Sequence, residues 1–531
     1  MSEVRLNRIQ SQSGLPIEVL PGIGYTPAGV GAVATTVQSK LRESVSVKDF
    51  GAVGNGVADD TAACQLAINS GAASVFFPAG TYRVSFLELV SNQKLYGEGV
   101  TSIILATTVT ADRPAGVFSS TAASGIEVCY LKFQGINRPE NNNPANQDGD
   151  RGISFHSCSN VNIHDCEVEG FWSFGIVCSG GSDIRIANNY VHGIGNQSCI
   201  AISNHVSHAT VTGNICADGK LYGIEAENQT TRASIVGNSI SNCVAGIAVV
   251  NGCRHIAVTG NNIFSCNNTN TISGSTGMGL FYVGNQENPL YNIATSGNVV
   301  ADNDVYALVI FGGHQNLVFS GNTFKNRGSN ISGKLVEVVL GTGLRRNVIF
   351  SGNIFDCFNA SNAFVADTIS EYSFSSNVIY NPRGNVFTFL GACNDNNFEL
   401  PKIPAGYIDL IPNQEGLAGG FTNWFWSNDK SEQYVTANGA GVFERNITSL
   451  RKEKLVGIYW CVHSNTSTGN WVLRVNGADI GNQIPAVAGQ EVWTFLPLNI
   501  ITAAGASTRI GVANTVGHGF GDYFKFRLVN L

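Results

Sequence analysis

Two glutamates separated by a single residue, Glu225 and Glu227, carry the clearest chemical signal in the sequence. If they lie in a β-strand, their side chains leave the same face, with Cα atoms roughly 6 to 7 Å apart. Two carboxyl groups held this close perturb each other's pKa, so one can act as a general acid while the other serves as base or nucleophile. Hydrolysis of a glycosidic bond needs such a pair. The alternative is that both glutamates only keep an exposed strand soluble.

Other side chains near this pair are candidates for further catalytic and binding groups. Asp218 precedes the pair in the segment ADGKLYG and could provide the second carboxylate. Tyr222 and Trp172 carry flat rings that can stack on sugars. His156 and Arg232 complete the expected substrate-binding set.

A competing chemistry is β-elimination on a uronic-acid polymer, which needs a basic side chain and a group that neutralises the substrate carboxylate. The basic residues in this part of the chain are His192, His205, His208, Lys220 and Arg232. A calcium ion would need several converging oxygen ligands, and no cluster of aspartates suited to this stands out. We therefore favour hydrolysis and expect no metal or other cofactor.

The middle of the chain repeats itself, which indicates how these residues are positioned. Segments such as ATVTGNIC, ASIVGNSI and IAVTGNNI share a column that is mostly asparagine and recurs about every 24 residues, with two longer intervals that indicate inserted loops. The members of this column are Cys166, Asn189, Asn214, Asn238, Asn261, Asn298, Asn322, Asn353 and Asn377. Three short strands per repeat predict an all-β fold, a parallel β-helix, in which the asparagines form a hydrogen-bonded ladder.

The third strand of each repeat places the two glutamates on the outside of this solenoid. Aligning the repeats puts Glu225 in one outward column, with Ile224 and Ala226 pointing inward. The other members of that column are Ser154, Val177, Ala201 and Ala248. Because the neighbouring residues are small, we expect a shallow groove around the pair.

The segment before the repeats predicts a cap on the core. Asp60 or Thr61 can cap a short helix from about Ala62 to Asn69, which Gly71 ends. The following VFFPAGTY is typical of a strand and a Pro-Gly turn. The helix would close the open end of the solenoid.

Composition and charge argue against several classes of protein. The formal net charge is −7 and no dense basic run occurs, so we expect no binding of nucleic acid. The sequence contains no apolar stretch long enough to span a bilayer and no signal-peptide pattern, so we expect synthesis in a cytoplasm and no membrane insertion. The thirteen cysteines show no metal-binding spacing, which favours free thiols in the core.

Two longer stretches resemble known proteins. VKDFGAVGNGVADDTAA, followed by VFFPAGTY, resembles the opening of the pectate-lyase-like right-handed parallel β-helix superfamily. GAVATTVQSKLRESVSVKDFGA, which starts at Gly31, resembles the junction found in many bacteriophage tailspikes. With the repeats, the resemblance covers roughly residues 30 to 400. It implies a homotrimeric tailspike that depolymerises a bacterial capsule.

These features predict three regions. Residues 1–45 would anchor the protein to the virion, and residues 46–400 would form the β-helix that binds and cleaves the receptor. Residues 401–531, which are rich in tryptophan, would form an antiparallel β-sandwich for trimerisation or carbohydrate binding. The expected partners are a capsular polysaccharide or O-antigen, two more copies of the chain, and a phage tail or adaptor protein at the N-terminus. A polysaccharide lyase and a spike that binds without cutting are the alternatives.

Overall fold

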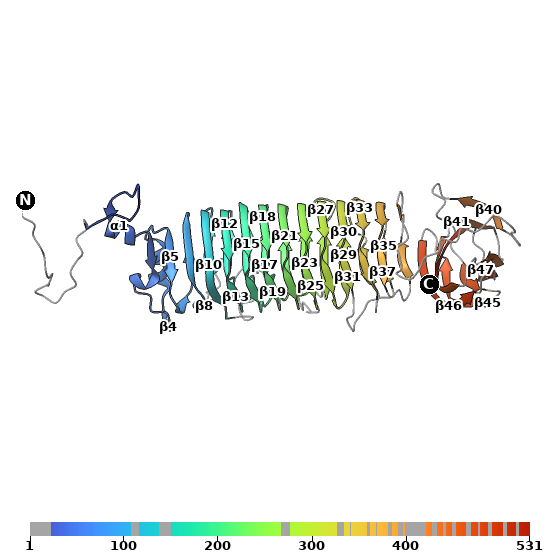
Figure 1. The fold of residues 1–531 in the computed structure, drawn as a ribbon, viewed down its shortest axis with the longest axis horizontal. Coiled ribbons are helices and arrows are strands. Elements are labelled where there is room, and N and C mark those ends of the chain that lie inside the picture. Colours follow the sequence, from blue (N-terminus) through green and yellow to red (C-terminus); the bar gives the residue numbers. More distant parts are fainter. Residues whose placement is uncertain are drawn as a thin grey trace, which may run out of the picture.

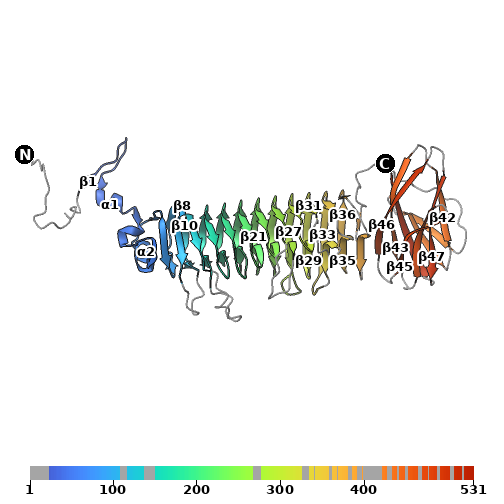
Figure 2. The same cartoon turned by 90° about the horizontal axis from the view of Figure 1, so that it is seen from below.

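The computed structural model is an elongated rod of stacked coils, with the N-terminal helices at one end and the C-terminal strands at the other (Figures 1 and 2). It describes residues 23–107, 116–136, 150–266, 277–325, 334–339, 341–357, 362–367 and 369–380. Beyond Tyr380 it describes the backbone of the strands named below, without their side chains.

The N-terminal elements close one end of the core. They are β1 (Gly24–Tyr25), β2 (Thr35–Thr36), α1 (Val37–Leu41), β3 (Ser44–Ser46), η1 (Val47–Phe50), β4 (Asn55–Asp59), α2 (Thr61–Ile68), β5 (Ser74–Phe77), β6 (Gly80–Val84), β7 (Leu87–Glu88), β8 (Gln93–Ala106), β9 (Phe118–Thr121) and β10 (Ser124–Gln134). Helix α2 buries Cys64, Ala67 and Ile68 against the first coils, as expected for a cap.

The predicted capping hydrogen bond of this helix is not formed. Asp60 occupies the N-cap position, but its side chain makes no bond to the first turn of α2. Its carboxylate instead accepts the backbone N–H groups of Val53 and Gly54 at 2.6 and 3.0 Å. The carboxylate bonds these two N–H groups instead of those of the first turn of α2, because an extended loop offers them no backbone acceptor.

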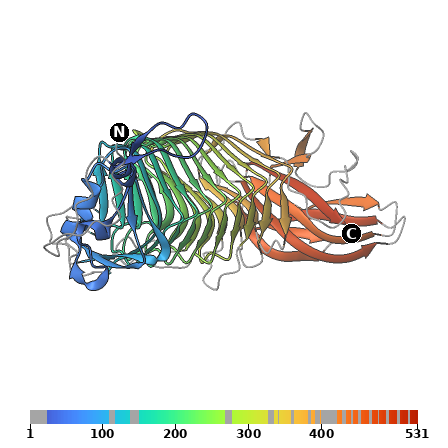
Figure 3. The ribbon, with the colours of Figure 1, turned by 60° about the vertical axis from the view of Figure 1, so that its left-hand side comes forward.

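The central coils contain three strands each, which stack in parallel to give three long faces (Figure 3). Face A consists of β12 (Ser159–His164), β15 (Ser182–Ala187), β18 (Ser207–Thr212), β21 (Thr231–Val236), β24 (Arg254–Thr259), β27 (Leu290–Ser296), β30 (His314–Ser320), β33 (Arg345–Ser351) and β36 (Ser370–Ser375), with β39 (Asn397–Phe398) paired to β36. The fold is therefore the predicted parallel β-helix.

Faces B and C follow the same repeat. Face B consists of β13 (Glu167–Glu169), β16 (Tyr190–His192), β19 (Ile215–Ala217), β22 (Ser239–Ser241), β25 (Asn262–Phe264), β28 (Val299–Ala301), β31 (Thr323–Lys325), β34 (Ile354–Asp356) and β37 (Val378–Tyr380). Face C consists of β11 (Ile153–His156), β14 (Ile176–Ser179), β17 (Ile200–Ser203), β20 (Tyr222–Ala226), β23 (Ala245–Val250), β26 (Met278–Val283), β29 (Tyr306–Phe311), β32 (Lys334–Val339), β35 (Asn362–Asp367) and β38 (Asn385–Leu390).

The asparagine ladder forms at the bend between faces A and B, as predicted. The side-chain amide of each member from Asn189 to Asn353 donates to the side-chain oxygen of the next member, at 2.9 to 3.0 Å. In the first coil, the backbone N–H of Cys166 donates to Asn189 at 3.0 Å. Because each amide is buried and bonded on both sides, the ladder keeps the coils in register even across the 37-residue interval from Asn261 to Asn298.

The cysteines support the predicted free core thiols. All eleven cysteines whose side chains are described are unpaired and buried. Burial raises the pKa of the Cys166 thiol to about 12, which keeps it protonated. These thiols therefore pack as small apolar groups.

The C-terminal strands pair in antiparallel fashion. They are β40 (Phe421–Trp426), β41 (Gln433–Asn438), β42 (Val442–Thr448), β43 (Glu453–His463), β44 (Gly469–Val475), β45 (Ala478–Ala486), β46 (Glu491–Thr502), β47 (Ser507–Val516) and β48 (Phe520–Asn530). Strand β46 also pairs with β38, which links this region to the last coil. The predicted sandwich packing, the trimer and the virion-anchoring role of residues 1–45 stay predictions, and residues 1–22 lie outside the described residues. No helix in the described part of the chain has the length and apolar character needed to cross a bilayer.

Candidate functional site

The outer side of face C carries the predicted glutamate pair. Strand pairing aligns Glu225 of β20 with Ala201 of β17 and with Ala248 of β23. Val177 of β14 and Ser154 of β11, which are two and three strands from β20, continue the same column toward the N-terminus. The column derived from the aligned repeats is therefore confirmed residue by residue.

The surroundings of the pair are more enclosed than the sequence suggested. Glu225 is only 5% exposed, and the outward residues Val177, Ala201 and Ala248 are buried as well. The connection that precedes β17 lies against this face, because its buried Ser198 hydroxyl donates to Oε2 of Glu225 at 2.7 Å. The small side chains of neighbouring coils are therefore buried beneath a connection, and the expected open groove around the pair is not formed.

Glu225 holds its proton unusually tightly. Burial, followed by the negative charge of Glu227, raises its pKa to about 8, although the hydrogen bond from Ser198 acts in the opposite direction. At neutral pH this side chain is therefore mainly a carboxylic acid, which can donate a proton.

Glu227 lies directly after β20 and is less enclosed. Its backbone N–H donates to the carbonyl oxygen of Ile202 at 3.0 Å, which fixes it beside the preceding coil. Burial raises the pKa of its carboxyl group, while hydrogen bonds with Asn251 and Asn228 limit the rise. Among the described residues, no lysine, arginine or histidine contributes to the pKa of either glutamate.

Tyr222 joins the pair on the same strand. Burial and the charges of Glu225 and Glu227 raise the pKa of its phenol, so the hydroxyl stays protonated. Its ring lies beside that of Phe281 of β26, with centroids 6.0 Å apart. The site therefore combines two unequal carboxyl groups with a phenol at the edge of an aromatic surface.

The other predicted site residues come from other elements. Asp218 is in an exposed turn and accepts a hydrogen bond from Asn242 of the next coil. Arg232 is exposed at the start of β21 on face A, in a left-handed conformation with φ of 54°. Trp172 lies in the connection before β14, where its backbone N–H donates to Asp150 at 2.9 Å. His156 is on face C, but β11 is three strands from β20, roughly 14 Å at the usual strand spacing.

The basic residues considered for elimination are also distant from the pair or exposed. His205 and His208 have left-handed backbone conformations and are exposed, as is Lys220. His192 lies on face B, with Nε2 at 3.4 to 3.5 Å from oxygens of Glu167 and Glu169. None of these residues contributes to the pKa shift of Glu225 or Glu227.

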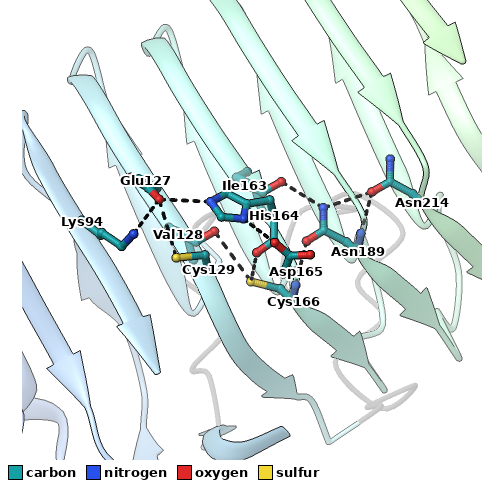
Figure 4. A network of polar contacts seen from close by, with 10 residues as sticks. All are labelled: Lys94, Glu127, Val128, Cys129, Ile163, His164, Asp165, Cys166, Asn189 and Asn214. Carbon is teal, nitrogen blue, oxygen red and sulfur yellow. Dashed lines mark hydrogen bonds and ion pairs between the residues drawn. The ribbon is translucent and has the colours of Figure 1, made fainter. Parts of the chain in front are cut away.

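A separate polar network on the outer side of the first coils was not predicted (Figure 4). Glu127 of β10 accepts from Lys94 at 2.9 Å, and His164 lies between Glu127 and Asp165 at 3.1 and 2.7 Å. Glu127, His164 and Cys129 offer ligand atoms that lie close enough together to hold a metal ion. They do not fit one well, because Lys94 already neutralises Glu127 and burial raises the pKa of the Cys129 thiol to about 11.

A second unpredicted cluster lies on face B. Lys132 is 2.8 Å from Glu167 and 3.0 Å from Glu169, and His192 approaches both glutamates. Glu167, Glu169 and His192 offer ligand atoms for a metal ion. However, the ammonium group of Lys132 already lies between the two carboxylates. Lys132 and Glu167 are 35 residues apart in the sequence but lie on adjacent, paired strands. Only the alignment of successive repeats could have indicated that they meet.

A family model described as rhamnogalacturonase A/epimerase, pectate lyase-like, matches residues 44–248. The pre-neck appendage protein of Bacillus phage B103 is 27% identical over 235 residues, which is 39% of this chain and 27% of that protein. This chain thus spans about a quarter of the length of that relative. Mannuronan C5-epimerase AlgE2 from Azotobacter vinelandii is 43% identical over 72 residues, 11% of this chain and 7% of that enzyme.

Solved structures give the same fold. The A-module of mannuronan C-5 epimerase AlgE6 from Azotobacter vinelandii has a TM-score of 0.56 and 19% identity, covering 68% of this chain and 99% of the module. The Dettilon tailspike protein has a TM-score of 0.53 and 15% identity, covering 93% of this chain and 96% of the tailspike. The predicted resemblance to the pectate-lyase-like parallel β-helix superfamily, with phage appendages and tailspikes among the similar proteins, is therefore confirmed.

Proposed function

We propose that this chain is a phage spike that binds a bacterial surface polysaccharide and hydrolyses its glycosidic bonds at Glu225 and Glu227. One observation carries the proposal. The two carboxyl groups share one side of face C without a countercharge, and the more buried one keeps its proton at neutral pH. An acid and a base of this kind are what hydrolysis of an acetal requires.

In this mechanism Glu225 is the general acid. Its proton passes to the glycosidic oxygen while the bond from that oxygen to the anomeric carbon breaks. Glu227, which is more accessible, either removes a proton from the attacking water or attacks the anomeric carbon itself. The anomeric configuration of the first product distinguishes these two routes.

The remaining parts of the proposal concern the particle. The phage appendage relative and the tailspike fold support a place in the virion tail, with an N-terminal attachment to a tail or adaptor protein. We further propose a homotrimer, a capsular polysaccharide or O-antigen as the substrate, and a trimerisation or sugar-binding role for residues 401–531.

Elimination on a uronic-acid polymer is the second candidate because Tyr222, a possible base, lies beside the pair. Two features make it less favourable. The pKa of this phenol is raised, which opposes its action as a base, and no described cation lies close enough to the pair to affect its pKa or to neutralise a substrate carboxylate there.

The test is to incubate the full-length protein with a panel of capsular and O-antigen polysaccharides and to analyse released products by mass spectrometry. Saturated oligosaccharides of repeat-unit size support hydrolysis. Unsaturated uronates would replace it with elimination at Tyr222. Tight binding of a polysaccharide without any product would leave a non-catalytic receptor-binding spike.

A further inference from the structure

The outer side of face C changes character at the glutamate pair. Toward the N-terminus, the outward residues of β11, β14 and β17 include Ser154, His156, Ser179 and Ser203. These side chains offer hydroxyl and imidazole groups. The polar residues His156, Ser179 and Ser203 share one column, while the column of Glu225 itself continues through Ala201 and Val177.

Toward the C-terminus the outward columns carry only apolar and aromatic side chains as far as β29. Strand pairing continues the column of Glu225 through Ala248, Phe281 and Val309, and that of Tyr222 through Ala245, Met278 and Tyr306. A third column runs through Val250, Val283 and Phe311. We call these nine residues of β23, β26 and β29 the apolar track. It contains no charged residue and ends at β32, where Lys334 pairs with Glu337.

The apolar track is separate from the main core, and only part of it reaches the surface. Five of its residues are buried, whereas Phe281, Val283 and Tyr306 are partly exposed. Ala245, Met278 and Val309 form a hydrophobic cluster separate from the main core, with Tyr222, Phe281 and Tyr306 packed against it. Phe311 is 39% exposed. The exposed ring of Phe311 and the partly exposed rings of Phe281 and Tyr306 thus lie on the same side of the sheet as the two carboxyl groups.

We propose that the apolar track binds the sugars on one side of the cleaved bond, and that these sugars carry methyl or acetyl groups. This inference rests on the proposed hydrolysis at Glu225 and Glu227. Each coil rises roughly 4.8 Å, close to the length that one pyranose adds to an extended chain, so successive rings can meet successive strands. A sugar whose only substituents are hydroxyl groups would lose hydrogen bonds to water there without replacement, whereas methyl or acetyl groups would not.

Continuity with the catalytic pair favours a saccharide over a second copy of the chain. The apolar track continues the outward columns of β20, so a polymer that lies along the rod over Phe281 and the partly exposed Tyr222 also passes the glutamate pair. A second copy packed on the track would instead block one side of the bond that is cut.

The experiment measures binding of full-length Glu225→Gln protein, which cleaves slowly, to polysaccharides of the panel. Phe311→Ala is added in this background, with Phe264→Ala as the matched control, because Phe264 is 36% exposed on face B. We expect Phe311→Ala to weaken binding about fivefold or more and Phe264→Ala to change it less than about twofold. Thermal unfolding and light scattering check that both variants fold and keep the same assembly.

Base treatment of the polysaccharide separates the two sources of apolar groups. If removal of O-acetyl groups abolishes the effect of Phe311→Ala, the apolar track binds acetyl groups. If the effect persists on a polysaccharide that contains a deoxy sugar, the track binds the methyl group of that sugar. If it persists on a polysaccharide with neither group, the track stacks on plain sugar rings and the inference is overturned.

Two further results would overturn it: equal affinities of the two phenylalanine variants, or a smaller assembly caused by Phe311→Ala, which would assign the track to a contact between copies. The proposed function fails separately, if the Glu225→Gln and Glu227→Gln variants cleave at the wild-type rate while Phe311→Ala still weakens binding. Failure of every polysaccharide to bind would reject both.

Discussion

The chain contains the same short pattern, Glu-x-Glu, on two strands of the same solenoid, and the two copies have opposite electrostatics. Glu167 and Glu169 belong to β13 on face B, whereas Glu225 and Glu227 belong to β20 and its end on face C. Both pairs are partly or largely buried and both place two carboxyl groups on one side of a strand. Their local sequence patterns are therefore nearly equivalent.

The neighbours on adjacent coils make the difference. Burial alone would raise the pKa of Glu167, but hydrogen bonds and charge from Lys132, followed by those from His192, lower it below its usual value. Glu225 is more deeply buried and receives only a neutral hydroxyl from Ser198, so its pKa rises. A carboxylate pair with a cation is a stabilising surface feature, and one without a cation keeps a proton available for chemistry.

The largest expected effect is on catalysis. Glu225→Gln and Glu227→Gln each remove one proton-transfer group, so we expect kcat for polysaccharide cleavage to fall by about 10³-fold. Glu167→Gln and Glu169→Gln are the matched controls on β13 and should change kcat less than about twofold. Product formation measured by mass spectrometry decides between them. Equal losses from both pairs would remove the distinction between the two faces.

The next effect is on stability. Lys132→Met leaves Glu167 and Glu169 together without their ammonium partner, and we expect about 2 kcal/mol less stability at neutral pH. The lowered pKa of Glu167 means that the wild-type contribution is present above pH 4.5 and is lost as the pH falls through the folded-state value. The cost of the substitution should therefore shrink toward pH 3. Chemical denaturation at several pH values measures it, and a cost independent of pH would contradict the ion-pair explanation.

The sequence predicts the solenoid and the position of the pair because both depend on period. The asparagine column fixed the coil length, and alternation along the third strand placed Glu225 outward and Ile224 inward, as found. Insertions did not disturb this prediction, since the ladder from Asn261 to Asn298 bridges a long interval.

Contacts between coils could not be predicted in the same way. Ser198 reaches Glu225 from a connection whose path depends on the packing of neighbouring coils, and no local pattern describes that path. The same limitation applies to Asp218, which the sequence groups with the pair only because it is close along the chain. The structure shows its carboxylate accepting a hydrogen bond from Asn242 of the next coil, and its role at the pair stays a prediction.

Glu225→Gln should also stabilise the protein, in a manner that depends on pH. The raised pKa of Glu225 means that the folded protein binds a proton that the unfolded chain releases above pH 4.5, so wild-type stability falls as the pH rises from there toward 8. The variant avoids this loss, which is about 1.4 kcal/mol for every pH unit of the interval as an upper bound. Denaturation at pH 5 and pH 8 tests it, with Glu169→Gln as the control. An equal gain at both pH values would indicate improved packing instead.

The smallest effect is on the pH dependence of the rate. In the proposed mechanism kcat/KM falls at high pH as Glu225 loses its proton, so the basic limb reports the pKa of this group. The hydroxyl of Ser198 lowers that pKa, and Ser198→Ala should therefore move the basic limb upward by about one pH unit. Ser203→Ala, on the same face but without an observed bond to Glu225, should leave the limb in place. If both variants shift it equally, or neither does, the basic limb belongs to another group and Glu225 is not the acid.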